Sequence, residues 1–191
     1  VSANSEELGQ VVADALFRVG ADGACTCEPS KELRDNLDFA EGLEQEMGFI
    51  SDVFVKDLES QSNTMDGARI LVTDQALTTM NDILPVLEGV LSTQEPLLII
   101  ALDVAGDAMS GLTLNVKKGV VDVCVCKAPG FGEVRNQYLQ DICVFSGATF
   151  CTSELGRKPE NATLADLGTL ERAVLTKKNT LLVCNGEHEA G

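Results

Sequence analysis

One stretch of the chain, residues 97–133, constrains the possible folds more than any other. Residues 97–101 (LLIIA) form an unbroken apolar run of strand length, which predicts a strand that is covered on both faces. Residues 120–126 are also mainly apolar and predict a second buried strand. Between these two runs, apolar residues recur at helical spacing. A strand, a helix and another strand in this order predict an α/β fold.

The expected helix between the two strands carries one apolar residue outside its core face. Four apolar residues fall within one arc of roughly 100°, and they are Ala108, Met109, Leu112 and Val116. Leu114 falls nearly opposite that arc. A leucine off the core face can bind a partner, but singly exposed leucines are common on soluble proteins. Both interpretations of Leu114 remain open from the sequence alone.

The residues before this stretch predict a turn, a strand and a helix. Residues 63–67 are expected to form a turn, and residues 70–73 a strand. We expect a helix to follow, with Asp82 as its N-cap and Pro85 in its first turn, where no backbone N–H is needed. The apolar residues of this helix span an arc of roughly 160°, wider than one buried face requires; they are Ile83, Leu84, Val86, Leu87, Val90 and Leu91.

The two ends of the chain add further helices and a hairpin. Residues 8–19 predict an amphipathic helix that Gly20 ends. Residues 133–146 predict another helix, whose expected core face consists of Val134, Tyr138, Ile142 and Phe145. Residues 170–176 and 180–184 predict a β-hairpin. The elements together indicate a mixed α/β chain.

The composition limits the classes of partner. The 191 residues carry a formal net charge of −16, which disfavours nucleic acid and anionic membranes, because both bind basic surfaces. No apolar run is long enough to cross a bilayer. The chain begins at Val1 and shows no signal peptide, so we expect it to be a piece of a longer protein from a reducing compartment.

Residues that could carry catalysis or bind a metal are few. The pairs Cys25-x-Cys27 and Cys124-x-Cys126 lack the C-x-x-C spacing of zinc and redox sites, and we expect each pair to lie on one sheet face as small apolar side chains. The only histidine, His188, is near the C-terminus and poorly placed to activate a nucleophile. We therefore expect no metal site and no catalytic residue. A cysteine-dependent redox enzyme stays open as a minor alternative that requires a thiol with a depressed pKa.

Several motifs occur in a fixed order along the chain. They are Leu97-Leu98-Ile99-Ile100, Asp103-Val104, Leu114-Asn115, Lys127-Ala128-Pro129-Gly130-Phe131-Gly132 and Leu139-Gln140-Asp141-Ile142. In this combination the chain resembles the apical region of the group I chaperonins, the Hsp60 family. The glycine loop alone would indicate little, because the G-x-x-x-x-G-K-[ST] order that binds phosphate is absent from the sequence.

The resemblance implies a division into domains. It implies an intermediate-domain fragment at residues 1–40, an apical, polypeptide-binding domain at residues 41–186 and a return to the intermediate domain at residues 187–191. Gly42 and Gly186 match the two hinge crossings, where glycine can change φ and ψ without a Cβ penalty. The implied apical fold is a β-sandwich-like core of mixed sheets flanked by helices.

The resemblance also implies an apolar groove between two helices, which binds non-native polypeptides and the mobile loop of a co-chaperonin. Matched position by position, the groove residues are Phe49, Ile50, Ser51, Val53, Phe54, Leu84, Leu87, Met109, Thr113, Leu114 and Asn115. We expect the leucines and phenylalanines of this set to be exposed and clustered, and Leu87 and Leu114 not to complete the core. Asp52 and Thr113 depart from the family's pattern and add polar groups, so we expect weaker binding than the family's average.

The resemblance implies a function for the longer protein as well. It implies a ring-forming, ATP-dependent chaperonin whose partners are non-native polypeptides, a co-chaperonin and other ring subunits. ATP and Mg²⁺ belong to the family's equatorial domain, whose phosphate-binding motif is absent from this sequence, so we expect neither a cofactor nor ATP hydrolysis in this chain. As an acidic, cysteine-rich and divergent sequence of this resemblance, the chain looks more like an organellar paralogue than a bacterial one, with the chloroplast stroma favoured over the mitochondrial matrix. The alternative is a structural or co-chaperonin-docking subunit of a mixed ring with weakened substrate binding.

Overall fold

The computed structural model describes residues 41–57, 61–153 and 156–184. The chain divides into two compact units after Gly42, and nearly all described residues belong to the second unit, residues 43–191. Several positions named above lie outside the described residues, namely residues 8–19, Cys25, Cys27, Gly186 and His188. Gly42 itself lies within a strand, so the hinge proposed there stays a prediction.

The central sheet contains the strand that most constrained the sequence analysis. Its strands lie in the order β7, β5, β3 and β8, and β9 also pairs with β3. Their bounds are Arg69–Thr73 for β3, Leu97–Ala101 for β5, Val123–Lys127 for β7, Phe150–Cys151 for β8 and Gly168–Thr169 for β9. β3, β5, β7 and β8 run parallel, whereas β9 runs antiparallel to β3. Every residue of β5 is buried, which confirms the expected strand with two covered faces.

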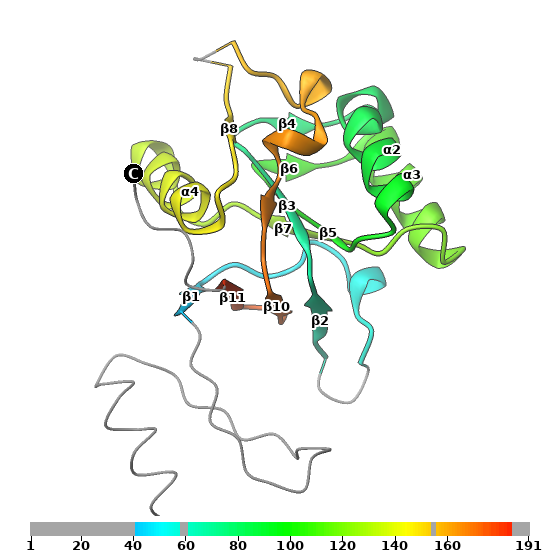
Figure 1. Ribbon diagram of the computed structural model, residues 1–191, viewed down its shortest axis with the longest axis horizontal. Coiled ribbons are helices and arrows are strands. Elements are labelled where there is room, and N and C mark those ends of the chain that lie inside the picture. The colour runs from blue at the N-terminus through cyan, green and yellow to red at the C-terminus, as the bar shows by residue number, and fades with distance from the viewer. Residues whose placement is uncertain (1–40, 58–60, 154–155, 185–191) are drawn as a thin grey trace, which may run out of the picture. The chain divides into compact units, whose positions relative to one another are not determined.

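Three α-helices of the described region connect the parallel strands. α2 (Leu84–Thr93) joins β3 to β5, α3 (Gly106–Lys117) joins β5 to β7, and α4 (Gly132–Ser146) joins β7 to β8. The chain therefore crosses twice in one direction along the sheet and then returns past β3. Because such crossovers are right-handed, α2 and α3 cover one face and α4 covers the other. Figure 1 shows α2 and α3 side by side and α4 across the sheet from them.

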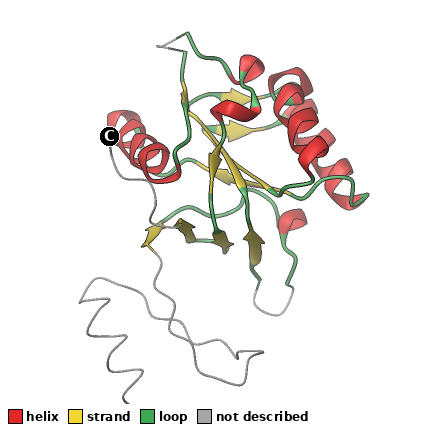
Figure 2. Ribbon diagram, viewed as in Figure 1, coloured by secondary structure: helices red, strands yellow, loops and turns green. Residues whose placement is uncertain are grey.

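A second sheet has four strands (Figure 2), and its strand β10 pairs antiparallel with both β11 and β2. Its strand order is β1, β11, β10, β2, with bounds Glu41–Gln45, Thr180–Cys184, Arg172–Leu175 and Asn63–Asp66. β10 and β11 pair from Arg172 with Val183 to Leu175 with Thr180, which confirms the expected hairpin. A short parallel pair, β4 (Ala76–Leu77) and β6 (Asp103–Val104), adds a third sheet. The protein is thus mixed α/β, as the sequence predicts.

The two larger sheets meet around the buried thiols of β7. Phe49 forms an antiparallel bridge with Cys126, whose Sγ lies 3.8 Å from Oγ1 of Thr180. The Thr180 hydroxyl donates a hydrogen bond of 2.7 Å to the carbonyl oxygen of Met47. Cys124 is also buried and interacts with the Cys126 thiol. The two cysteines of β7 therefore share one face as small buried side chains, which confirms that expectation.

Two expected boundaries near the strands are wrong. Residues 63–67 are not a turn, because Asn63–Asp66 pairs with β10 as strand β2 and buries alternate residues. Asparagine, aspartate and glycine favour turns locally, but pairing with a neighbouring strand overrides that preference. The second strand of the central stretch begins at Val123 instead of at residue 120. Val120 lies before it in a loop and is 52% exposed.

α4 buries a different face from the expected one. Its buried residues are Leu139, Ile142, Cys143 and Ser146, and only Ile142 belongs to the predicted set. Val134 and Tyr138 are exposed. The buried stripe lies about 100° around the helix from the predicted one. Ser146 can lie in this stripe because its hydroxyl donates a hydrogen bond of 2.7 Å to the carbonyl oxygen of Ile142. Gly147 ends the helix with a φ of 70°, as glycine permits.

The segment before α2 also differs from the expectation. Pro85 lies in the first turn of α2, as predicted, but the N-cap is Ile83 and not Asp82. Asp82 ends a short 3₁₀ helix, η2 (Met80–Asp82), and its carboxylate accepts hydrogen bonds from the backbone N–H groups of Thr78 (3.0 Å) and Thr79 (2.9 Å). The hydrogen bond from the Thr79 backbone is the main reason why the pKa of Asp82 is lowered.

Candidate functional site

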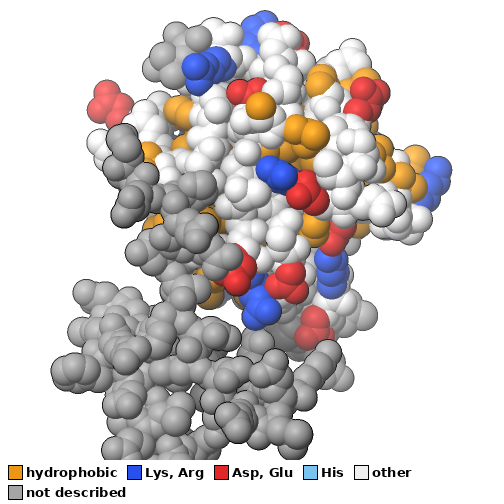
Figure 3. Space-filling view, viewed as in Figure 1, with side chains coloured by type: hydrophobic (Ala, Val, Ile, Leu, Met, Phe, Trp, Pro, Cys, Tyr) orange, Lys and Arg blue, Asp and Glu red, His pale blue; other side chains and the backbone are white. Residues whose placement is uncertain are grey.

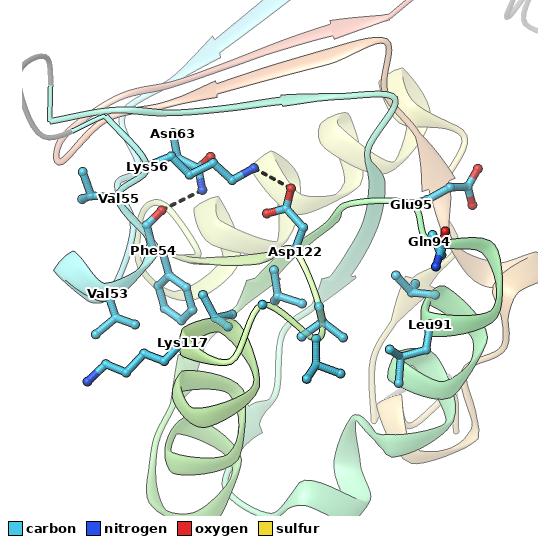
Figure 4. A pocket seen from close by; sticks show the side chains of 16 residues that line it. Val53, Phe54, Val55, Lys56, Asn63, Leu91, Gln94, Glu95, Lys117 and Asp122 are labelled. Atoms are coloured by element: carbon cyan, nitrogen blue, oxygen red, sulfur yellow. Dashed lines mark hydrogen bonds and ion pairs between the residues drawn. The ribbon is translucent and has the colours of Figure 1, made fainter.

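A hollow of about 580 Å³ opens between the C-terminal ends of α2 and α3 (Figure 4). One wall is Val53–Lys56, which comprises the end of the 3₁₀ helix η1 (Asp52–Phe54) and the residues after it. A second wall is the end of α2, from Val90 to Glu95. The third is the end of α3 together with the loop that leads into β7, residues 116–123. A hollow of this size falls in the range of roughly 300–1,000 Å³ that is usual for ligand sites.

More than half of the residues that line this hollow are apolar. The apolar side chains that line it are Val53, Phe54, Val55, Val90, Leu91, Val116, Val120, Val121 and Val123. Leu91 and Val120 are also exposed at the surface, by 42% and 52%. Leu84 on α2 and Leu114 on α3 are exposed by 41% and 53%. Figure 3 shows apolar side chains gathered over these helices. An exposed apolar surface beside a hollow indicates a binding site.

The ends of the two helices give the hollow its shape. α2 ends at Gln94, which has a left-handed φ of 57° and donates its backbone N–H to the carbonyl oxygen of Val90 at 2.8 Å. α3 is followed by Gly119, whose φ of 66° is accessible to glycine at little cost. After this glycine, the backbone N–H of Val120 donates to the carbonyl oxygen of Asn115 at 3.0 Å. The chain therefore turns back at once and contributes the loop before β7 to the third wall.

Four charged side chains line the hollow, and two of them pair with each other. The Lys56 ammonium lies 2.5 Å from the Asp122 carboxylate, an ion pair that joins the η1 wall to the loop before β7. Glu95 pairs with Arg69 outside the lining, and the Arg69 guanidinium donates hydrogen bonds of 2.9 and 3.2 Å to it. These bonds are the main cause of the lowered pKa of Glu95. The fourth charged side chain is Lys117, in the last turn of α3.

Asn63 supports the η1 wall through a hydrogen bond. Its side chain is buried, and its amide Nδ2 donates a hydrogen bond of 2.7 Å to the carbonyl oxygen of Phe54. Figure 4 shows this bond beside Lys56. Asn63 is not among the residues predicted for the site, because the sequence of residues 63–67 predicts a turn. Its role depends on the pairing of β2 with β10, for which the sequence of β2 contains no local signal.

The structure brings together part of the site expected from the sequence. Val53 and Phe54 line the hollow, and η1 packs against α3. Leu84 and Leu114 are exposed on the two helices, as expected. The other predicted residues of the same segments are half-buried, and these are Ile50, Ser51, Met109, Thr113 and Asn115.

The expected exposure of Phe49, Phe54 and Leu87 is wrong. They are 7%, 1% and 3% exposed and belong to the core. Phe49 is held by its bridge to β7, and Phe54 forms part of the hollow's inner wall. α2 is covered by two further 3₁₀ helices, η3 (Pro159–Asn161) and η4 (Leu164–Asp166), as well as by the sheet. This cover explains how α2 can bury more of its wide apolar arc, Leu87 included, than the sheet alone would require.

The residues that the sequence analysis missed lie mainly at the ends of α2 and α3. Leu91 belongs to the apolar arc predicted for α2 but not to the predicted site, although it lies seven residues after Leu84 and therefore shares its stripe. Val120 was assigned to a buried strand. Its position after Gly119 could have indicated a helix end instead, because glycine commonly follows the last turn of a helix.

The buried thiols have properties that do not fit a redox enzyme. Burial raises the pKa of Cys143 to about 12 and that of Cys151 to about 11. The neighbouring Cys126 thiol, together with burial, raises the pKa of Cys124. A reactive cysteine needs a depressed pKa, because the thiolate is the nucleophile. These three thiols therefore argue against the redox alternative.

Comparison with known proteins adds no family assignment, because no family model matches the chain. Among the described residues, no group of three or more histidine, cysteine, aspartate or glutamate side chains is arranged to hold a metal ion. No helix in the described ranges is both long and apolar enough to span a membrane. The apolar hollow is therefore the feature on which a functional proposal rests.

Proposed function

We propose that this chain is the polypeptide-binding, apical part of a group I chaperonin, and that it holds non-native polypeptides and the co-chaperonin's mobile loop in the hollow between α2, α3 and η1. One observation carries the proposal. The hollow lies between the two helices and the segment for which the resemblance of the sequence implies a binding groove, but at the C-terminal ends of the helices, and of the predicted groove residues only Val53 and Phe54 line it. Its apolar lining, which includes the exposed Leu91 and Val120, supports this function, because non-native polypeptides expose apolar side chains.

The arrangement of the sheets also supports the proposal. A parallel sheet with helices on both faces lies against the second, four-stranded sheet, with the Cys126 and Thr180 side chains in contact between them. This is compatible with the core of mixed sheets and flanking helices that the resemblance implies. In this proposal ATP and Mg²⁺ act in another part of the longer protein, which forms a ring in an organelle, with the chloroplast favoured. The 191 residues themselves contribute binding and no hydrolysis.

The strength of binding can be estimated from the half-exposed leucines of α2 and α3 and from Val120. Burying the rest of a half-exposed aliphatic side chain contributes about 1 kcal/mol, at roughly 25 cal/mol per Å² of apolar surface. Three or four such contacts contribute about 3–4 kcal/mol, which corresponds to a Kd on the order of millimolar, and the cost of ordering a flexible chain weakens this further unless other lining residues also contact the peptide. Binding of this strength is reversible, which a chaperone requires so that its substrates can be released.

The test compares one substitution in the hollow with a matched one outside it. Val120→Asp places a charge in the lining, whereas Val144→Asp places the same charge on an exposed valine of α4, across the sheet. We expect Val120→Asp to weaken binding of a reduced and alkylated, permanently unfolded protein by about tenfold, on the order of 1.4 kcal/mol. Val144→Asp should leave binding unchanged, and both variants should keep the melting temperature within a few degrees.

Two results would contradict the proposal. Equal weakening by both variants would mean that binding is not located in the hollow. Absence of measurable binding by the unaltered chain would mean that the hollow is not a polypeptide site. Isothermal titration calorimetry and thermal melting on the same samples provide both measurements.

A second candidate function is supported by the burial of predicted groove residues. Phe49, Phe54 and Leu87 are buried, and the exposed Asp52 lies 3.7 Å from the Lys177 ammonium, so less apolar surface is exposed than the resemblance implies. A subunit that docks a co-chaperonin but binds substrates weakly would have these properties. The two functions are distinguished by titrating the chain with a co-chaperonin loop peptide and with an unfolded protein. Binding of the peptide alone would favour the docking subunit.

A further inference from the structure

We infer that the hollow prefers peptide segments in which apolar side chains are flanked by a carboxylate, and that Lys117 sets this preference. The inference rests on the proposed function, because it names the class of polypeptide that the hollow binds. It goes beyond that function, because an apolar hollow alone would bind acidic, neutral and basic segments equally well.

Three of the four charged side chains that line the hollow are paired, and one has no ion-pair partner among the described residues. Of the four charged lining residues, Lys56 and Asp122 pair with each other and Glu95 pairs with Arg69. Lys117 forms no ion pair with any residue of the described ranges. The next residue, Lys118, is exposed as well. Within the described part of the chain, Lys117 therefore places an unpaired positive charge at the mouth of the hollow, on a chain whose formal net charge is −16.

The position of Lys117 suits a contact with a bound peptide. It lies in the last turn of α3, and its side chain lines the hollow. Figure 4 shows it extending past Val53, with its ammonium directed away from Glu95 and Asp122. Figure 3 likewise shows basic side chains next to apolar ones at the edge of the molecule where α3 ends. The methylene groups of a lysine can pack along an apolar wall while its ammonium stays in water. Such an ammonium can pair with a peptide carboxylate that lies next to a bound apolar side chain.

A lysine at the end of a helix also has a simpler role. Its charge interacts favourably with the partial negative charge of the helix C-terminus. That role explains its place in the sequence but leaves its ammonium accessible, so it does not compete with binding a carboxylate. On the opposite side, Glu88 lies on the same exposed stripe of α2 as Leu84 and Leu91. A peptide carboxylate is therefore expected at the α3 side, away from Glu88.

The experiment uses three synthetic peptides that share a Leu-Val-Leu core and differ only in its flanking residues, which are glutamate, glutamine or lysine. We expect the unaltered chain to bind the glutamate peptide about threefold more tightly than the glutamine peptide, and the lysine peptide least tightly, because one rim charge contributes little. The preference should shrink at high salt, which screens exposed charges. Lys117→Gln should remove it without weakening the glutamine peptide. Lys178→Gln, which removes the same charge from the β10–β11 turn outside the lining, should keep it.

The outcomes separate this inference from the proposed function. If the unaltered chain binds the glutamate and glutamine peptides equally, the preference does not exist, while peptide binding by the hollow stands. If Lys117→Gln keeps the preference, another residue causes it and the inference is wrong. If none of the three peptides binds, or if Val120→Asp leaves their binding unchanged, the proposed function fails and the inference fails with it.

Discussion

Leu87 and Leu114 lie on neighbouring helices, and replacing each with alanine tests which of them belongs to the core and which to the binding surface. Leu87 is 3% exposed and lies in the core together with Val86 and Val90. Leu→Ala at such a site costs roughly 2–5 kcal/mol, because transfer free energy is lost and a cavity remains. Leu114 is 53% exposed, so its truncation should cost less than about 1 kcal/mol.

The assay follows unfolding and binding on the same two variants. The chain contains no tryptophan, so urea unfolding is best followed by far-ultraviolet circular dichroism. We expect Leu87→Ala to reduce the free energy of unfolding by about 3 kcal/mol with an unchanged m-value, and to lower the melting temperature by roughly 6–12 °C. Folded Leu87→Ala should bind unfolded protein as the unaltered chain does. Leu114→Ala should melt normally but bind several-fold more weakly.

The reverse pattern would refute this reasoning. A cost below about 1 kcal/mol for Leu87→Ala would mean that η3, η4 and the sheet do not enclose the side chain as described. A cost above about 2 kcal/mol for Leu114→Ala would mean that this leucine completes the core instead of the binding surface. Either result would require a different assignment of the faces of α2 and α3.

The remaining predictions concern a capping carboxylate, a tightly enclosed glycine and the buried thiols. Asp82→Ala should reduce the free energy of unfolding by about 1 kcal/mol near neutral pH. Because folding lowers the pKa of Asp82 below its usual 3.8, this contribution should be present above pH 3.8 and be lost as the pH falls through the lowered value. A cost that persists in acid would contradict the assignment. Gly48→Ala should reduce the free energy of unfolding by more than about 2 kcal/mol, because its Cβ would lie 2.0 Å from a backbone carbonyl oxygen. Gly119→Ala, whose Cβ would lie in open space at a φ of 66°, should cost only about 1–2 kcal/mol. Similar urea midpoints for the two variants would refute this difference. Cys143 and Cys151, whose pKa values are raised to about 12 and 11, should resist thiol reagents at pH values near 8 until urea unfolds the chain, and labelling of the native protein within minutes would argue against their burial.

Features that depend on neighbours along the chain could be predicted from the sequence by itself. The apolar run of β5, the helix that became α3 and the end of α4 at Gly147 depend on local spacing, on strand length and on the conformational freedom of glycine. The exposure of Leu114 followed from its place opposite the core face of α3. These properties are local, so the order of residues determines them before any long-range contact forms.

The tertiary structure alone decided the features that depend on which faces of the helices and strands pack together. α4 offered two stripes about 100° apart, and the position of the sheet selected the one with Leu139. The wide arc of α2 could have left Leu87 exposed, but η3 and η4, more than sixty residues later in the chain, add cover to this helix. Asn63 became a buried support of η1 only because β2 pairs with β10. The hollow itself combines three segments that are distant in sequence, and burial depends on such contacts, which local periodicity does not encode.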